Sequence, residues 1–169
     1  KYEEALAWYE KALAIREKVL GPDHPDTATT YNNIASTYSG QGKYEEALAW
    51  YEKALAIREK LLGPDHPYTA ETYNNIAFIY GRQGEYDEAL AWYEKALAIF
   101  EKILGSAHPY TAETYNNIAF IYDSQGKYDE ALAWYEKALV IFEKVLGPDH
   151  PDTATTYNNI AEVDKMLNK

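Results

Sequence analysis

The chain of 169 residues contains no cysteine. Disulfide bonds, a catalytic thiolate and a cysteine-ligated zinc site are therefore excluded. The sequence also has no apolar run near the roughly 20 residues of a membrane-spanning helix, no signal peptide and no Asn-x-Ser/Thr glycan acceptor. We therefore expect a cytoplasmic location. Because the chain begins at Lys1, inside a repeat and without an initiator Met, we also expect it to be part of a longer protein.

Positive charge is scarce as well. The 16 basic residues stand against 27 acidic ones, which gives a net charge of −11. Binding to nucleic acid or to an anionic membrane requires a basic face, so neither partner is expected. Most of the negative charge should lie on a solvated outer surface, where it favours basic or neutral protein partners. Apolar residues make up 47% of the chain, enough to build a core, so disorder is not expected.

What the chain does contain is one segment repeated four times. KYEEALAWYEKALAIREK from Lys1 returns from Lys43 and, with few changes, from Glu85 and Lys127. A period of this length is typical of stacked supersecondary units rather than of one globule around one core. We expect a single array over residues 1–169, made of the repeats 1–42, 43–84, 85–126 and 127–169. Its four tryptophans are spaced by 42 residues: Trp8, Trp50, Trp92 and Trp134.

Each repeat predicts a long first helix. Within residues 44–62, apolar side chains recur at spacings of three and four, which places them on one face of an α-helix. The remaining positions are filled mostly by Glu, Lys and Ala, all good helix formers. Gly63 should end this helix, because glycine adopts the left-handed conformation at little cost, and Pro64 prevents its continuation.

A second helix follows in each repeat. In the second repeat it begins either with Pro67 as its first residue or with Thr69 as its N-cap, and it ends near Gly84. The chain therefore predicts eight helices, stacked as four antiparallel pairs in an all-α solenoid. The last helix should begin near Thr153.

The helix contacts and the two ends of the array also show in the sequence. We interpret residues 162–169 as a polar C-terminal cap, because Glu162 and Asp164 replace residues that are apolar or uncharged in earlier repeats. The first helix shows no such adaptation, so it offers a surface for self-association. Eight alanines should allow neighbouring helices to approach closely: Ala5, Ala12, Ala47, Ala54, Ala89, Ala96, Ala131 and Ala138.

The run Y-N-N-I-A-x-x-Y-x-x-Q-G-x-Y-x-E-A-L-x-W-Y-x-K-A-L resembles the tetratricopeptide repeat. The 42-residue period exceeds the usual length of about 34 and is similar to the repeats of kinesin light chain and of arrays attached to signalling NTPases. The resemblance implies a right-handed superhelix with a concave peptide-binding groove and no catalytic chemistry of its own. The matching positions are Tyr73, Ile76, Ala77, Tyr80, Gly84, Tyr86, Ala89, Tyr93 and Ala96.

An Asn-Asn pair recurs in the second helix of every repeat, although Asn is a mediocre helix former. Amides on a groove-facing side can donate to and accept from a peptide backbone without reading its side chains. The alternative is that these amides link helix to helix inside the array, and both roles are compatible. The resemblance implies peptide binding by the second Asn of each pair: Asn33, Asn75, Asn117 and Asn159.

The differences between repeats gather on the same helix face, because they follow steps of three and four residues around the Asn row. Such variation beside unchanging packing positions is typical of a specificity surface, and drift at tolerant positions is the alternative. Exposed aromatics among polar groups are common interface anchors. The candidate residues in the middle repeats are Glu71, Phe78 and Arg82 around Asn75, and Glu113 and Phe120 around Asn117.

Other chemistries find little support. A clamp for a C-terminal carboxylate needs basic groove residues, whereas Glu71 and Glu113 would repel it. The four loop histidines lie one repeat apart, which favours helix capping over a metal site. No phosphate loop or nucleophile motif is present, so neither a cofactor nor enzymatic activity is expected. Phe100 and Phe142, which replace Arg16 and Arg58, are interpreted as repacking of the extended helix.

We therefore hypothesise a protein-interaction module that binds an extended peptide in its groove. Asn75 and Asn117 would hold the peptide and Phe78 and Phe120 would select it, which favours an apolar or aromatic ligand with basic flanks. One alternative is a structural or self-associating scaffold, natural or engineered from a consensus. Another is a regulatory arm of a larger signalling protein.

Overall fold

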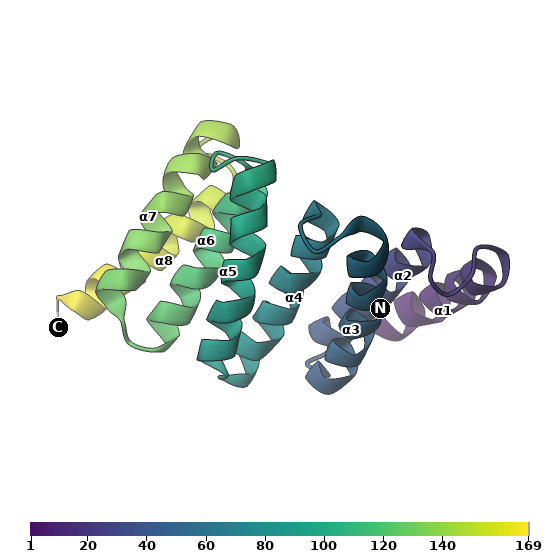
Figure 1. The fold of residues 1–169 in the computed structure, drawn as a ribbon. Coiled ribbons are helices and arrows are strands. Elements are labelled where there is room, and N and C mark those ends of the chain that lie inside the picture. Colours follow the sequence, from purple (N-terminus) through teal and green to yellow (C-terminus); the bar gives the residue numbers. More distant parts are fainter. Residues whose placement is uncertain (169) are drawn as a thin grey trace. The chain divides into compact units, whose positions relative to one another are not determined.

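The computed structural model describes residues 1–168, and these residues form helices joined by short connections, with no strand among them (Figure 1). The predicted all-α class is confirmed. Lys169, the last residue of the proposed polar cap, lies outside the described residues. The eight helices of the described chain are α1 (Tyr2–Val19), α2 (Pro25–Gly40), α3 (Tyr44–Leu62), α4 (Pro67–Gln83), α5 (Tyr86–Ile103), α6 (Pro109–Ser124), α7 (Tyr128–Val145) and α8 (Pro151–Leu167).

The Asn-bearing helices α2, α4, α6 and α8 all begin in the same way. In α4 the N-cap is His66 and Pro67 is the first helical residue. A start with Thr69 as N-cap is excluded, because Thr69 lies inside the helix and its Oγ1 donates to the carbonyl oxygen of Gly63 at 2.9 Å. The same start recurs in α8, which therefore begins at Pro151 rather than near Thr153.

Glycine ends the helices of the second repeat where the sequence predicts it. α3 ends at Leu62, and Gly63 follows with a φ of 93°. α4 ends at Gln83, and Gly84 follows in the left-handed conformation with a φ of 82°. Any other residue would be strained at these two positions, because a Cβ disfavours positive φ.

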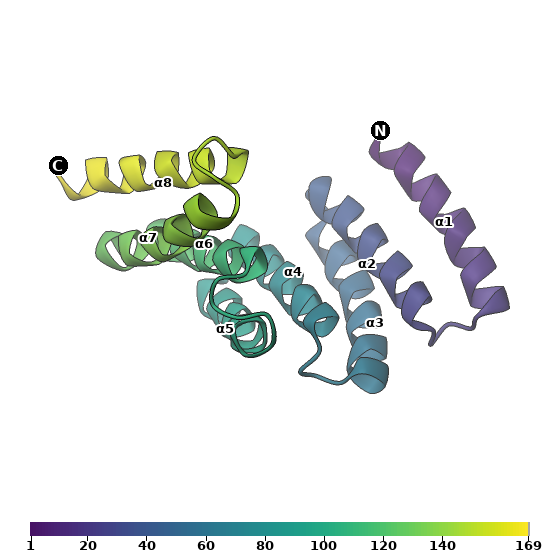
Figure 2. The same ribbon diagram turned by 90° about the horizontal axis from the view of Figure 1, so that it is seen from above.

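The N-terminal unit comprises residues Lys1–Gly84 and contains α1 to α4. α2 lies between α1 and α3 and packs most extensively on α3, to which a tight turn connects it (Figure 2). The contacts of α1 with α2 and of α3 with α4, across the longer loops, are less extensive. A buried cluster joins three of these helices: Leu6, Leu13, Ala28, Tyr31, Ile34, Ala54 and Ile57.

The C-terminal unit comprises residues Glu85–Lys169 and contains α5 to α8. Here α6 packs most extensively on α7, again across a tight turn, and α7 also contacts α8. One buried cluster combines Ala119 of α6, Ala131 and Tyr135 of α7, and Val163 of α8. The two units thus repeat one packing scheme, in which an Asn-bearing helix lies against the long helix that follows it.

Small residues sit where the long helices meet their neighbours. Six of the eight alanines singled out from the sequence are fully buried, which confirms the expected close approach: Ala47, Ala54, Ala89, Ala96, Ala131 and Ala138. The other two, Ala5 and Ala12, are only partly buried. They lie on α1, where no helix of the N-terminal unit covers the equivalent face.

Both ends of the described chain expose apolar side chains. On α1, Trp8 is 68% and Ile15 63% exposed, whereas Ile57, at the position of Ile15 in the next repeat, is 7% exposed. On α8, Glu162 and Asp164 face solvent, as a polar cap requires. Tyr157, Met166 and Leu167 are also exposed on that helix, so its outer surface is mixed rather than uniformly polar.

Candidate functional site

The loop histidines position the Asn-bearing helices. His66 Nδ1 accepts a hydrogen bond from the backbone N–H of Tyr68 at 3.1 Å, and the histidines before α2, α6 and α8 make the equivalent bond. This satisfies one of the backbone donors that a helix start leaves without an intrahelical partner. The predicted capping role is confirmed.

A tyrosine–glutamate bond ties each Asn-bearing helix to the long helix before it. The Tyr31 hydroxyl donates to Glu17 Oε1 at 2.7 Å, and the Tyr73 hydroxyl donates to Glu59 Oε1 at 2.5 Å. Burial, together with the bond to Glu17, raises the pKa of Tyr31 to about 12. The bond recurs between Tyr115 and Glu101, so the Asn-bearing helices are held at both their starts and their middles.

The N-terminal unit has a cavity of about 400 Å³ beside the Asn row. It lies between the first turns of α2 and α4, with the end of α3 at its base. Two of the candidate residues, Asn33 and Glu71, meet there. The lining residues are Pro25, Asp26, Thr29, Asn32, Asn33, Arg58, Leu62, His66, Tyr68 and Glu71.

The C-terminal unit has a cavity of about 540 Å³ at the equivalent place, between α6 and α8 with the end of α7 at its base. Asn117 and Glu113 meet in it, as Asn33 and Glu71 do in the first unit. Each lining residue is the two-repeat counterpart of one in the N-terminal cavity: Pro109, Tyr110, Glu113, Asn116, Asn117, Phe142, Leu146, His150, Asp152 and Thr155.

The first Asn of two pairs, Asn32 and Asn116, links successive Asn-bearing helices. Asn32 is buried, and its Oδ1 accepts a long bond from Asn75 Nδ2 at 3.5 Å. In the C-terminal unit, Asn116 Oδ1 accepts from Thr156 Oγ1 at 3.3 Å. These bonds support the alternative in which the amides link helix to helix, and the bond to Asn32 uses the amide nitrogen of Asn75 rather than its oxygen.

The aromatic candidates lie away from the two cavities. Phe78 is 43% and Phe120 42% exposed, so both are accessible on α4 and α6. Arg82, one turn beyond Phe78, donates from Nε to the Tyr44 hydroxyl at 3.3 Å. Asn159 is partly buried on α8. The structure thus gathers Asn33 with Glu71 and Asn117 with Glu113, and places the phenylalanines further along the same helices.

Sequence reasoning missed the side chains that distinguish the two cavities. Arg58 and Phe142 occupy the same base position, and Tyr68 and Tyr110 line opposite walls. From the sequence, the replacement of arginine by phenylalanine indicates only repacking of the extended helix. A signal was available, because residues 26, 68, 110 and 152 also vary, three positions before the variable row that begins at Thr29.

The Arg58 guanidinium is held by its own unit. Its Nη1 donates to the Tyr68 carbonyl oxygen at 2.7 Å, to Thr72 Oγ1 at 2.8 Å and to Glu71 Oε2 at 3.2 Å. Burial lowers the pKa of Arg58, and the neighbouring Glu71 opposes that shift. The group remains a cation and neutralises part of the carboxylate charge in its cavity.

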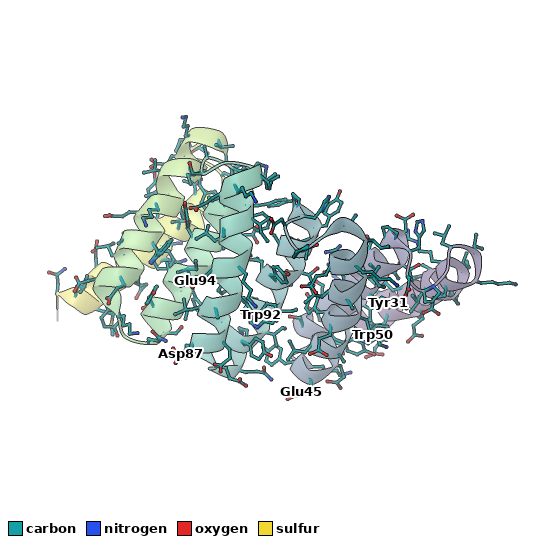
Figure 3. The ribbon with its side chains drawn as sticks, viewed as in Figure 1. Tyr31, Glu45, Trp50, Asp87, Trp92 and Glu94 are labelled. Carbon is teal, nitrogen blue, oxygen red and sulfur yellow. The ribbon has the colours of Figure 1, made fainter. Side chains whose placement is uncertain are left out.

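The tryptophans belong to a different surface of the units. Trp50 of α3 packs on Tyr31 of α2 with ring centroids 5.5 Å apart (Figure 3). Lys53 Nζ lies 4.0 Å from the centre of the Trp50 ring, and Lys137 lies at the same distance from Trp134. Both cation–π contacts lie within one helix and stabilise α3 and α7. The ring contacts of Trp50 with Tyr31 and of Trp134 with Tyr115 join two helices, which gives these tryptophans a structural role.

Helices paired across short turns, alanine at their contacts and a repeated start define an α-helical repeat protein. The comparisons with known proteins give the family. The tetratricopeptide repeat model matches residues 1–60, 35–102, 68–144 and 110–169, and the chain therefore belongs to the tetratricopeptide repeat family. Such repeats mediate protein–protein interaction, and their fold is typically that of a non-enzymatic scaffold. The resemblance seen in the sequence is confirmed.

The relatives point to the kinesin-light-chain-like form. The chain is 48% identical over 40 residues to the Arabidopsis thaliana protein KINESIN LIGHT CHAIN-RELATED 2, which covers 24% of this chain and 6% of that protein. Two solved structures resemble 99% of this chain at 28% identity. BtubC (BKLC) from P. vanneervenii has a TM-score of 0.85 over 66% of its chain. A putative kinesin light chain from Podosopora anserina, with nearly identical TPR-like repeats, has a TM-score of 0.76 over 79%.

The chain thus spans a small fraction of its curated relative and about two thirds of BtubC. Within residues 1–168, no helix combines the length and the apolar character needed to cross a bilayer.

Proposed function

We propose that the chain is a protein-interaction module in which each unit holds an extended segment of a partner protein against its own cavity. One observation carries this proposal. The same cavity occurs in both units, and each time it brings the second Asn of a pair together with a glutamate that only the middle repeats possess. A concave site with a few convergent polar groups is the usual form of a binding site.

In this proposal the Asn row binds the peptide backbone. Asn33 and Asn117 lie in the cavities, and Asn75 and Asn159 continue the row along the other helices. Each amide offers both a donor and an acceptor, which suits an extended chain whose N–H and C=O groups alternate. Asn75 uses one amide hydrogen toward Asn32, and its Oδ1 remains available to a peptide N–H.

Specificity would come from the exposed aromatics and the acids near them. Phe78 and Phe120 would contact apolar or aromatic side chains of the partner. Glu113 would favour basic residues beside it, as would the net charge of −11, whereas Glu71 is already paired with Arg58 at 3.2 Å. Arg82, already bonded to Tyr44, would border the Phe78 contact. The lack of cysteine is consistent with a cytoplasmic partner.

The test is selection of binders from a random peptide library, with an Asn33→Ala/Asn117→Ala double variant as counter-target. We expect peptides that the wild-type chain enriches and the double variant loses, with basic residues next to an aromatic one. A Glu52→Ala/Glu136→Ala variant is the matched control, because both glutamates are exposed on the long helices, outside the cavities. Circular dichroism must show that all three chains keep the same helix content and melting temperature.

Two results would contradict the proposal. One is no enrichment by the wild-type chain. The other is enrichment that the Asn33→Ala/Asn117→Ala variant retains in full. Equal enrichment of acidic peptides would contradict the proposed preference for basic ligands, since Glu113 should repel acidic ones.

A second function is supported by a separate observation. α1 exposes the apolar side chains of Trp8, Ile15 and Val19. Exposed apolar side chains that form a large contiguous patch are typical of an interaction surface. On this alternative the chain is a self-associating scaffold in which α1 packs on another copy. Light scattering should then show a mass that rises with concentration, and Trp8→Glu/Ile15→Glu should return the chain to a monomer. A concentration-independent monomer mass for the unmodified chain would exclude it.

A further inference from the structure

The two cavities are built from the same ten repeat positions, and their rims carry the same kinds of side chain on opposite walls. In the N-terminal cavity, Asp26 stands on α2, and Tyr68 and Glu71 stand on α4. In the C-terminal cavity, the tyrosine and glutamate come from the first wall and the aspartate from the second. Each rim therefore presents one tyrosine and two carboxylates.

The base of the cavities differs. Arg58 and Phe142 are equivalent residues on α3 and α7, and both are almost completely buried, at 4% and 5% exposure. Arg58 places a cation under its rim, whereas Phe142 places an aromatic ring there. In the N-terminal cavity Glu71 pairs with that guanidinium. The C-terminal cavity has no lysine or arginine among its lining residues, and Asp152 lies 3.6 Å from His150 there.

The contacts of Arg58 show which kind of group the rim of the N-terminal cavity binds. Its guanidinium forms an ion pair with Glu71, with Nη1 and Oε2 3.2 Å apart, and its central carbon lies 5.7 Å from the centre of the Tyr68 ring. A carboxylate and a tyrosine face together hold a cation from within the protein. The C-terminal cavity offers a carboxylate and a tyrosine as well, in Glu113 and Tyr110, but its base supplies no cation of its own.

We infer that the C-terminal cavity is the subsite for a lysine or arginine side chain of the bound peptide, and that Arg58 closes the N-terminal cavity to such a side chain. The inference rests on the proposed peptide binding and specifies that the bound side chain carries a positive charge. The aliphatic part of the ligand side chain would lie along Phe142 and Tyr110. Its charged end would reach Glu113 and Asp152, whose carboxylate is mostly exposed to solvent.

The two units supply their own matched variants, because each base residue is native to the other unit. Phe142→Arg gives the C-terminal cavity the arginine of the N-terminal one, and Arg58→Phe does the reverse. Glu113→Gln/Asp152→Asn is a second way to remove the charge of the C-terminal cavity. It changes only exposed side chains, so it remains informative if Phe142→Arg fails to fold. Glu136→Ala is the control.

The probes are four random peptide libraries with one fixed central residue: arginine, lysine, citrulline or norleucine. Citrulline keeps the shape of arginine without its charge, and norleucine keeps the stem of lysine. The wild-type chain should retain the arginine and lysine libraries about tenfold better than the neutral ones. A tenfold difference in affinity corresponds to about 1.4 kcal/mol of binding free energy. Phe142→Arg and Glu113→Gln/Asp152→Asn should abolish that preference. Arg58→Phe should strengthen it.

The inference is overturned if the libraries bind without a preference for the charged residues, or if the preference survives both C-terminal variants. In either case, binding that still requires Asn117 would leave the proposed function standing. Failure of all four libraries to bind the wild-type chain would overturn both.

Discussion

At the scale of single residues, each repeat depends on a few polar contacts that recur with every period. A histidine caps the Asn-bearing helix, a threonine one turn later donates to the glycine carbonyl of the preceding loop, and a tyrosine reaches back to a glutamate. Because these contacts connect the loop to both helices, they set the angle at which the second helix leaves the first.

Removal of one capping histidine tests this role. His66→Ala leaves the N–H of Tyr68 without its acceptor and should lower the free energy of unfolding by about 0.5–2 kcal/mol. His66→Asn should retain most of the stability, because the asparagine side chain is also a good N-cap. Urea denaturation followed by circular dichroism measures both. Equal losses for the two variants would show that ring packing on Tyr68, rather than capping, is what matters.

Asp123 predicts a pH-dependent effect. Partial burial raises the pKa of this carboxyl above its ordinary value of 3.8, so the folded state disfavours the charged form. The protonated carboxyl of Asp123 therefore contributes fully to stability below pH 3.8, and this contribution is lost as the pH rises through the raised pKa. Asp123→Asn should raise the melting temperature at pH 7 and change it little below pH 3.8.

A control for this variant comes from the N-terminal unit. Ser39 occupies the same repeat position as Asp123, and Ser39→Asn introduces the same amide without removing a charge. Its effect on the melting temperature should not vary with pH. A gain from Asp123→Asn that is as large in acid as at pH 7 would contradict the burial argument.

At the scale of the helix, the Asn-bearing helix and the long helix after it form the most closely packed pair in each unit. Alanine makes this approach possible, because Ala47 and Ala54 of α3 and Ala131 and Ala138 of α7 are fully buried. The tight turn between the two helices brings them together, whereas the longer His-containing loop allows a looser contact.

Enlarging one of these alanines should separate the pair. Ala54→Leu adds three carbon atoms to a filled contact and should destabilise the chain by about 1–3 kcal/mol. Ala12 occupies the same repeat position on α1, where it is only partly buried, and Ala12→Leu should cost much less. Thermal unfolding of the two variants measures the difference. Similar losses would show that helix propensity, rather than packing, controls this position.

At the scale of the whole molecule, negative charge dominates. The net charge of −11 is spread over all four repeats, and such self-repulsion opposes the compact state. Few of the ion pairs offset it strongly. The pair between Lys60 and Asp23, with Nζ and Oδ2 2.9 Å apart, is exposed on both sides, and exposed pairs contribute little.

Added salt should therefore stabilise the protein. Raising NaCl from about 10 mM to about 150 mM shortens the screening length from about 30 Å to about 8 Å, which weakens repulsion between repeats more than contact between paired charges. The melting temperature should rise, and KCl should have the same effect at equal ionic strength. A melting temperature that falls with either salt would mean that local ion pairs outweigh the overall repulsion.

The sequence by itself determined the secondary structure and the family. The 42-residue period, the spacing of apolar residues and the Gly and Pro positions were sufficient, because they act through local backbone preferences. The helix bounds at Gly63 and Gly84 followed from the same preferences. The start of α4 at Pro67 did not follow from them, because proline and threonine both favour helix starts. Only the hydrogen bond to His66 distinguishes the two possible starts.

Only the tertiary structure decided how the candidate site is composed. Asn33 and Glu71 line one cavity because two successive Asn-bearing helices lie side by side, although the two residues are 38 positions apart in the chain. Asn117 and Glu113 lie one turn apart on α6, so their spacing of four already placed them together. The sequence likewise could not show that Arg58 and Phe142 form the base of two equivalent cavities. The position of these two side chains depends on how three helices pack together. Helix packing, and not the local sequence, decides whether a buried side chain points into the gap between two other helices.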